Sequence, residues 1–239
     1  MTAGVVEGPS MVDLGASPGV PPPIPYYLTE QIRRGIILGR YPPGSPLREQ
    51  ALQAEFRCSR APIRDALRLL ERRGLVTHAP RQGFRVRRVT PEEVRQIYEV
   101  RALLERHAVE ELKDRVTPAL LEELRAQNVT MRSHREAGRV EEYIAANLAF
   151  HAALHRHAGN EPLARALDAV QELAEPLRHA MLVRSLHQSR AAEEHDKIID
   201  LLACNQIADA AAAMHRHVFT GMPAALDIVT DREWSGDVR

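Results

Sequence analysis

The sequence contains few cysteines and no long apolar run. Cys58 and Cys204 are the only cysteines among 239 residues, so no disulfide framework is expected, and each is predicted to be a small core residue. No apolar stretch approaches the ~20 residues that cross a bilayer, and the N-terminus lacks the basic-then-apolar layout of a signal peptide. These absences argue against a membrane protein and predict a cytoplasmic one.

The formal net charge of zero hides a strong segregation of charge along the chain. Residues 26–90 contain fourteen arginines and five acidic residues, a balance of +9, whereas residues 91–239 have a balance of −7. Neutralising phosphates with arginine releases condensed counterions and drives binding. The basic segment therefore predicts a polyanionic partner for that part of the chain.

Start and stop signals divide the N-terminal part into a small helical domain with a hairpin. Residues 1–25 are rich in Pro and Gly and are predicted to be a flexible leader. Within a predicted domain of residues 26–89, we expect helices over 26–38, 46–56 and 60–73, followed by a β-hairpin of residues 75–79 and 84–89. Ser45 and Ser59 are the expected N-caps of the second and third helices.

Residues 90–222 are predicted to form a second, all-helical domain. Helical periodicity over 91–114, 118–137, 139–158, 162–185, 189–204 and 206–220 predicts six helices without any strand. Six amphipathic helices joined by short loops favour an antiparallel bundle. Residues 223–239 are expected to be a tail.

The third predicted helix is a candidate DNA-reading element. Arg60, Arg64 and Arg68 are spaced four residues apart and share one face, while apolar residues form the opposite face. A solvated arginine face is the simplest alternative. The two-residue turn before this helix, the basic hairpin after it and the +9 segment favour contact with the bases or phosphates of a major groove.

Histidines in the C-terminal half suggest a metal site. His151, His195 and His217 fall on three predicted helices, and Asn147 precedes His151 by one helical turn. Three imidazoles with an open coordination position suit Zn²⁺, with Ni²⁺, Mn²⁺ or Fe²⁺ as alternatives. Because the chain has eleven histidines, ordinary surface or core histidines remain an alternative on residue spacing alone.

Arg101 falls inside the apolar stripe of the first bundle helix, so its guanidinium needs an anionic partner. The structural candidates are Glu105, Glu110 or another carboxylate of the chain. The functional candidate is the carboxylate of a small organic acid that also contacts the metal. Arg178 is a second, weaker candidate for the same pocket.

The N-terminal part resembles the winged helix-turn-helix domain of the GntR family of transcription regulators. The resemblance covers residues 26–89 and is carried by the strings Leu47-Arg48-Glu49-Gln50-Ala51-Leu52, Cys58-Ser59-Arg60-Ala61-Pro62-Ile63-Arg64-Asp65-Ala66-Leu67-Arg68, Gly74-Leu75-Val76 and Arg81-Gln82-Gly83-Phe84. It implies that Arg60 and Arg64 read bases and phosphates, that Arg48 supports them, and that Gly83 lets the wing tip enter the minor groove. Ser59 and Arg68 complete the expected DNA-binding set. Arg57 departs from the turn glycine usual in the family, and Gln50 stands where Arg or Glu is common.

The C-terminal part resembles the FCD domain of the FadR subfamily within that family. Asn147-Leu148-Ala149-Phe150-His151, Glu194-His195 and Met214-His215-Arg216-His217 carry the likeness. It implies metal binding by Asn147, His151, His195 and His217, with Asn147 in place of a more usual aspartate. The count of six helices is more similar to the VanR-type branch than to the acyl-CoA-binding type, which has a seventh helix.

Together these observations predict a mainly α protein that acts as a homodimeric regulator, a repressor, on an inverted-repeat operator in double-stranded DNA. A small carboxylate-bearing metabolite at the metal would control its affinity. A metal-dependent hydrolase is a rival hypothesis, opposed by the apparent lack of an acidic base beside the ligands and by the basic domain. An architectural DNA-binding protein with a purely structural helical domain is another.

Overall fold

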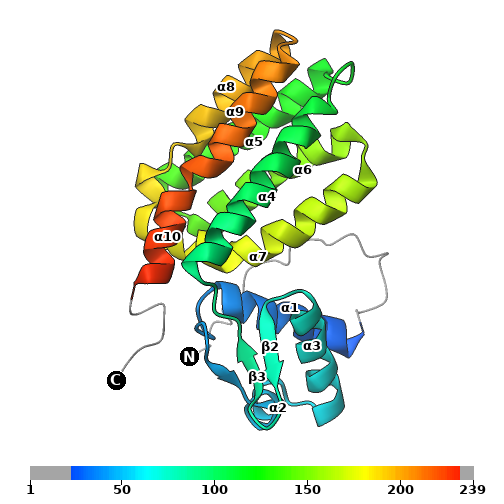
Figure 1. Cartoon of the computed structure of the whole chain (residues 1–239), viewed down its shortest axis with the longest axis vertical. Helices are drawn as coiled ribbons and strands as arrows, with labels where there is room; N and C mark the ends of the chain where they lie inside the picture. The colour runs from blue at the N-terminus through cyan, green and yellow to red at the C-terminus, as the bar shows by residue number, and fades with distance from the viewer. Residues whose placement is uncertain (1–22, 232–239) are drawn as a thin grey trace, which may run out of the picture.

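The computed structural model describes residues 23–231, arranged as a small domain beneath a long helical domain (Figure 1). The small domain consists of α1 (Ile24–Ile37), β1 (Pro46–Leu47), α2 (Glu49–Phe56), α3 (Arg60–Arg72), β2 (Val76–Ala79) and β3 (Gly83–Val86). Its three antiparallel strands follow the order β1-β3-β2. The winged helix-turn-helix prediction is therefore confirmed. Most of the predicted leader, residues 1–22, lies outside the described residues, and its last residues, 24 and 25, belong to α1.

The sequence pattern of α3 explains how this helix divides between core and solvent. Ile63, Ala66, Leu67 and Leu70 are buried in the core of the small domain. Arg60, Arg64 and Arg68 are exposed on the opposite side. Ser59 is the N-cap residue as expected, although its side chain makes no capping hydrogen bond.

The expected helix start at Ser45 and Pro46 is wrong. Pro46 and Leu47 instead form an edge strand, and α2 begins at Glu49 after Arg48. Backbone hydrogen bonds from Gly44 N to Val86 O (2.9 Å) and from Val86 N to Ser45 O (3.0 Å) join this segment to β3. A proline is compatible with an edge strand because it needs no ladder donor there.

The helical domain consists of α4 (Pro91–Glu110), α5 (Pro118–Glu136), α6 (Val140–Ala158), α7 (Glu161–Ser185), a 3₁₀ turn η1 (Leu186–Gln188), α8 (Ala191–Ala203), α9 (Ile207–Thr220) and α10 (Met222–Thr230). The six predicted helices are present, with some ends shifted. Their long helices pack around one apolar core to which α4, α6, α8 and α9 all contribute. Within residues 23–231, no helix is both long enough and apolar enough to span a membrane.

The predicted tail contains a seventh helix, α10. Ala225, Ile228 and Val229 are buried against the main core, and Pro223 lies in the first turn, where its missing N–H costs no hydrogen bond. Residues 223–230 are therefore part of the helical domain, and residues 232–239 lie outside the described part. The described part of the helical domain thus has seven α-helices rather than the predicted six, and the helix count no longer supports a likeness to the VanR-type branch.

Neither cysteine is a fully buried core residue, contrary to expectation. Cys204 is exposed at the end of α8, and Cys58 is half-buried before α3.

Arg57 ends α2 in the left-handed conformation, with φ 50° and ψ 44°. A side chain with a Cβ is strained there, and glycine is not. We expect Arg57→Gly to raise the free energy of unfolding by about 0.5–1 kcal/mol, and Arg57→Ala to give no such gain. Calorimetric unfolding of both variants checks this, and equal stabilities of the two would contradict the backbone explanation.

Candidate DNA-binding surface and ligand-binding cavity

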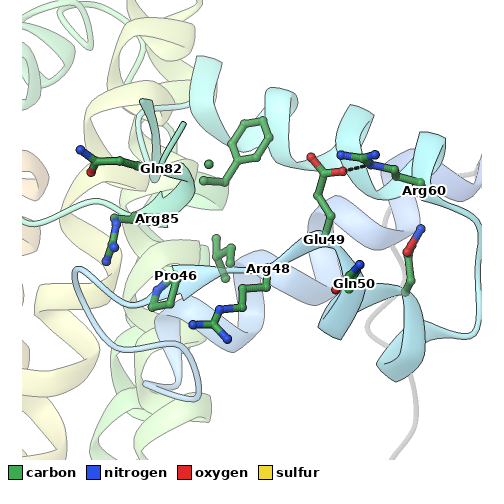
Figure 2. A pocket seen from close by; sticks show the side chains of 11 residues that line it. Pro46, Arg48, Glu49, Gln50, Arg60, Gln82 and Arg85 are labelled. Carbon is green, nitrogen blue, oxygen red and sulfur yellow. Dashed lines mark hydrogen bonds and ion pairs between the residues drawn. The ribbon is translucent and has the colours of Figure 1, made fainter. Parts of the chain in front are cut away.

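A groove of about 620 Å³ separates the start of α3 from the wing formed by β2 and β3 (Figure 2). Arg48, Arg60 and Gly83 from the predicted DNA-binding set line it, together with Gln50 and Arg85. Arg64 and Arg68 continue the exposed arginine face of α3 beyond the groove lining, and Ser59 is exposed at the start of that helix.

Glu49 is an acidic residue on this otherwise basic surface that the sequence reasoning did not single out. It forms an ion pair with Arg60, drawn in Figure 2, and its Oε1 lies 3.8 Å from Nε of Arg64. The carboxylate therefore pairs with Arg60 and lies close to Arg64. Its position in the first turn of α2, directly after Arg48, was the available signal.

Gly83 has the geometry expected of a wing tip. Its φ is +73°, and a Cβ built on it would meet no atom within 4 Å. A backbone without a side chain can approach a partner closely at this point. Arg81, at φ 65°, projects from the same turn.

His151, His195 and His217 converge in the helical domain, from α6, α8 and α9. One nitrogen from each lies within 4.8 Å of the others. The Nε2 atoms of His195 and His217 are 3.2 Å apart. The ring of Phe150 stacks on His195 at 3.8 Å between centroids and fixes its plane.

Carboxylates hold the outer ring nitrogens of two of these histidines. Nδ1–H of His151 donates to Glu105 (3.0 Å), and Nδ1–H of His217 donates to Glu194 (2.7 Å). Burial lowers the pKa of His151 to about 4 and that of His195 well below its usual value, so both rings are neutral at pH 7. Burial opposes ionisation of Glu194, yet the hydrogen bond and charge of His217 lower the pKa of this carboxyl.

This donor set fits a divalent metal ion. The Nε2 of His151 is buried and has no hydrogen-bond partner among the described residues, so its lone pair faces the other histidines. Two nitrogens bound to one ion lie about 3.0–3.4 Å apart for bonds of about 2.1 Å. The separation of 3.2 Å between His195 and His217 agrees with that range. Carboxylates behind ligating histidines are the usual outer support of such sites.

Asn147, the fourth predicted ligand, lies one turn before His151 on α6 and is buried at the wall of the neighbouring cavity. His217 lines the same cavity, while His151 and His195 lie behind it. Asn147 and His217 thus face the same cavity.

Glu105 is fully buried and joins three helices at one carboxylate. Its Oε2 accepts hydrogen bonds from His151 and from Nε2 of His155 (2.9 Å), and its Oε1 accepts one from Gln171 (3.2 Å). Burial opposes ionisation, but the two histidines hold the pKa of Glu105 well below its usual range. Nε of Arg101 lies 3.5 Å from Oε1, so the expected structural partner of Arg101 is Glu105.

Arg101 and Arg178 both line the cavity of about 260 Å³ beside the histidines. The structure thus brings the two predicted effector-binding arginines together. Arg178 is 6% exposed, and its Nε and both terminal nitrogens have no hydrogen-bond partner within the described part of the chain. Burial, followed by the charge of Arg101, lowers the pKa of Arg178 to about 10.

Ion pairs between α7 and the small domain join the two domains. Arg33 of α1 pairs with Glu175 and lies 3.2 Å from Glu172, which also lies 3.4 Å from Arg73 at the end of α3. Figure 1 shows α1 lying against α7 at the domain junction. A Cβ on Gly74 would lie 2.7 Å from Cδ2 of Leu173, so the backbone of Gly74 packs directly against this side chain of α7.

Family models match both halves of the chain. Residues 27–86 match "Bacterial regulatory proteins, gntR family", and residues 96–220 match the FCD domain. The chain is a GntR-family transcription regulator with an FCD domain. Regulators of this family bind DNA and typically act as dimers. The relatives of this chain are transcription regulators rather than enzymes.

Individual relatives support the same assignment. The chain is 32% identical over 181 residues to an uncharacterised regulator, YdhC, of Bacillus subtilis, covering 74% of this chain and 81% of that one. It is 31% identical over 202 residues to a probable D-xylose utilisation operon repressor of Paenarthrobacter nicotinovorans, covering 82% and 88%. The structure of E. coli McbR/YncC has the same fold, with a TM-score of 0.73 at 20% identity over 86% of this chain and 98% of that one.

One sequence argument against the hydrolase hypothesis is wrong. Glu105 and Glu194 do lie beside the histidines, although each is engaged by a ring nitrogen. The spacing of Glu105 four residues after Arg101, inside the buried stripe of α4, was a signal for the first of them. Family membership, rather than a lack of carboxylates, excludes the enzyme.

Arg64→Ala is expected to weaken operator binding by about 1–3 kcal/mol, because it removes a guanidinium from the exposed face of α3. Dimerisation and ligand binding should not change. Fluorescence anisotropy with labelled operator measures the effect, and Arg125→Ala, an exposed arginine of α5, is the matched charge control. Unaltered operator affinity would remove Arg64 from the interface.

Proposed function

We propose that the protein is a homodimeric repressor whose operator affinity is controlled by a small carboxylate-bearing acid bound beside a divalent metal ion. The observation that carries this proposal is the convergence of three histidines beside a cavity that His217 lines together with two buried arginines. A cavity of about 260 Å³ is small for a ligand pocket, which favours a small metabolite. We propose a cytoplasmic location, where a repressor reaches its operator DNA.

Asn147, His151, His195 and His217 are the proposed metal ligands. Zn²⁺ is the first candidate because it accepts imidazole nitrogen and an amide oxygen, with Ni²⁺, Mn²⁺ or Fe²⁺ as alternatives. The ion would supply positive charge and an open coordination position. Arg101 would orient the carboxylate, and Glu105 and Glu194 would hold the histidine rings in place.

On the DNA side, Arg48, Ser59, Arg60, Arg64, Arg68 and Gly83 form the proposed contact set. The two small domains of a dimer would each present this surface to one half of an inverted repeat in double-stranded DNA. Glu49 would keep Arg60 and Arg64 oriented toward the major groove of the DNA.

Helix α7 is the proposed connection between the two functions. Arg178 faces the cavity from this helix, and Glu172 and Glu175 bind the small domain from it. A ligand can shift an equilibrium only through different contacts in the two states. An acid that moves Arg178 would change the ion pairs that set the position of α1 and α3.

The variant His195→Ala tests the metal centre. We expect this variant to lose the metal, because too few ligands would remain to compete with chelators. The variant should fold, since apolar burial provides most of the stability of the bundle. It should lose the thermal stabilisation by an added acid and the response of operator binding, while operator binding itself persists. Metal analysis, thermal unfolding and anisotropy measure these effects.

His107→Ala is the matched control for that experiment, since His107 is an exposed histidine of α4. It should retain metal and response. If His195→Ala also retained both, the proposed metal site would be wrong. If metal-loaded wild-type protein responded to no acid, the architectural hypothesis would replace regulation by a ligand.

Arg33→Gln tests the connection through α7. It removes the partner shared by Glu172 and Glu175 and should reduce the change in operator affinity caused by an acid, without changing the affinity for the acid. Arg34→Gln is the neighbouring control, because its ion pair with Glu141 is exposed and contributes little. Equal responses of the two variants, measured by operator titrations with and without acid, would contradict this route.

A further inference from the structure

Arg178 presents a cationic group for which the described residues provide no counter-charge in direct contact. Three guanidinium nitrogens are buried without a hydrogen bond, although a buried charge is normally paired. The acidic residue three positions earlier on α7, Glu175, forms an ion pair with Arg33 of the small domain. Arg178 is therefore free to bind something that enters the cavity.

The cavity as a whole has an excess of positive charge. Arg101, Arg178 and Arg190 line it, against the single carboxylate of Glu194. Glu105 lies behind the wall and is engaged by Arg101 and the histidines. A divalent ion at the histidines would add two further positive charges. One carboxylate at the ion would leave Arg178 unpaired.

We propose that the effector is a small dianionic acid, with one carboxylate at the metal and Arg101 and a second anionic group at Arg178. This inference rests on the proposed function and narrows its class of ligand. The apolar part of the lining, from Met181, Leu182 and Val218, suits a short carbon chain between the two anionic groups. The second group can be a carboxylate or a phosphonate-like anion, since a guanidinium binds both bidentately.

The neighbouring polar groups are consistent with an anion at this position. Tyr98 lines the cavity, and its hydroxyl donates to Gly221 O at a long 3.4 Å. Burial raises the pKa of Tyr98, so its hydroxyl is protonated and can donate to an anion instead. The lining thus provides donors, and Glu194 is the one carboxylate among the lining residues.

The test uses full-length protein loaded with Zn²⁺ and calorimetric titration. The probes are malonate, succinate, glutarate and adipate, each beside its monomethyl ester, which keeps the chain and removes one charge. 3-Phosphonopropionate distinguishes a phosphonate from a carboxylate as the second group. At least one dianion should bind tenfold or more tightly than its singly charged counterpart.

Arg178→Gln should abolish this preference, so that the diacid binds no better than its ester, while ester affinity stays within about twofold. Arg178→Lys keeps the charge and should retain part of the preference. Arg165→Gln, an exposed arginine of the same helix, should behave as wild type. The melting temperature of Arg178→Gln without ligand should not fall, because no partner of Arg178 is lost.

Three outcomes would overturn the inference in distinguishable ways. If diacids and esters bound equally to wild type and to Arg178→Gln, the dianion inference would fail while the proposed metal-centred regulation stood. If no acid of either class bound to the metal-loaded protein or changed operator affinity, both would fail. A fall in the melting temperature of Arg178→Gln, with unchanged diacid preference, would make Arg178 a structural residue.

Discussion

The helical domain depends on one buried carboxylate, that of Glu105. It is completely inaccessible, and it binds Arg101 on its own helix, two histidines of α6 and Gln171 of α7. A buried carboxylate is tolerated only when its oxygens are satisfied, and here three side chains hydrogen-bond to them while Arg101 adds an opposite charge. Each of these side chains lines the cavity or packs directly behind its wall. The position of Glu105 therefore determines how the histidine cluster and the arginines are placed relative to each other.

Helix α7 connects this arrangement of side chains to the small domain. Gln171 binds Glu105, Glu172 and Glu175 bind the small domain, and Arg178 faces the cavity. Pro176 lies between these groups and cannot donate a hydrogen bond to the carbonyl of residue 172. The helix therefore has a weak point between its cavity end and its domain-contact end, which is where a change at Arg178 would be expressed as a bend.

The sequence predicted the features that depend on local periodicity. Ser59 and the arginines of α3 follow from helical spacing, and the likeness to a known family brought His151, His195 and His217 together across three helices. Prediction from the sequence failed where a contact between residues distant in the chain determined the local structure. Ser45 and Pro46 read as a helix start, but pairing with β3 made them a strand. The roles of Glu105 and Glu194 required knowledge of which ring nitrogen each would face, which spacing along one helix does not give.

The unpaired charge in the cavity has an energetic consequence for regulation. Leaving one partner of a buried ion pair without its counter-charge costs about 3–5 kcal/mol in proteins. A ligand that changes the affinity of a second site by 5- to 150-fold needs a coupling free energy of only about 1–3 kcal/mol. If an anion bound at Arg178, relief of this charge would be large enough to supply such a coupling, provided that the relief differs between the two states of the protein. The protein without ligand would then hold, at Arg178, free energy that the ligand releases on binding.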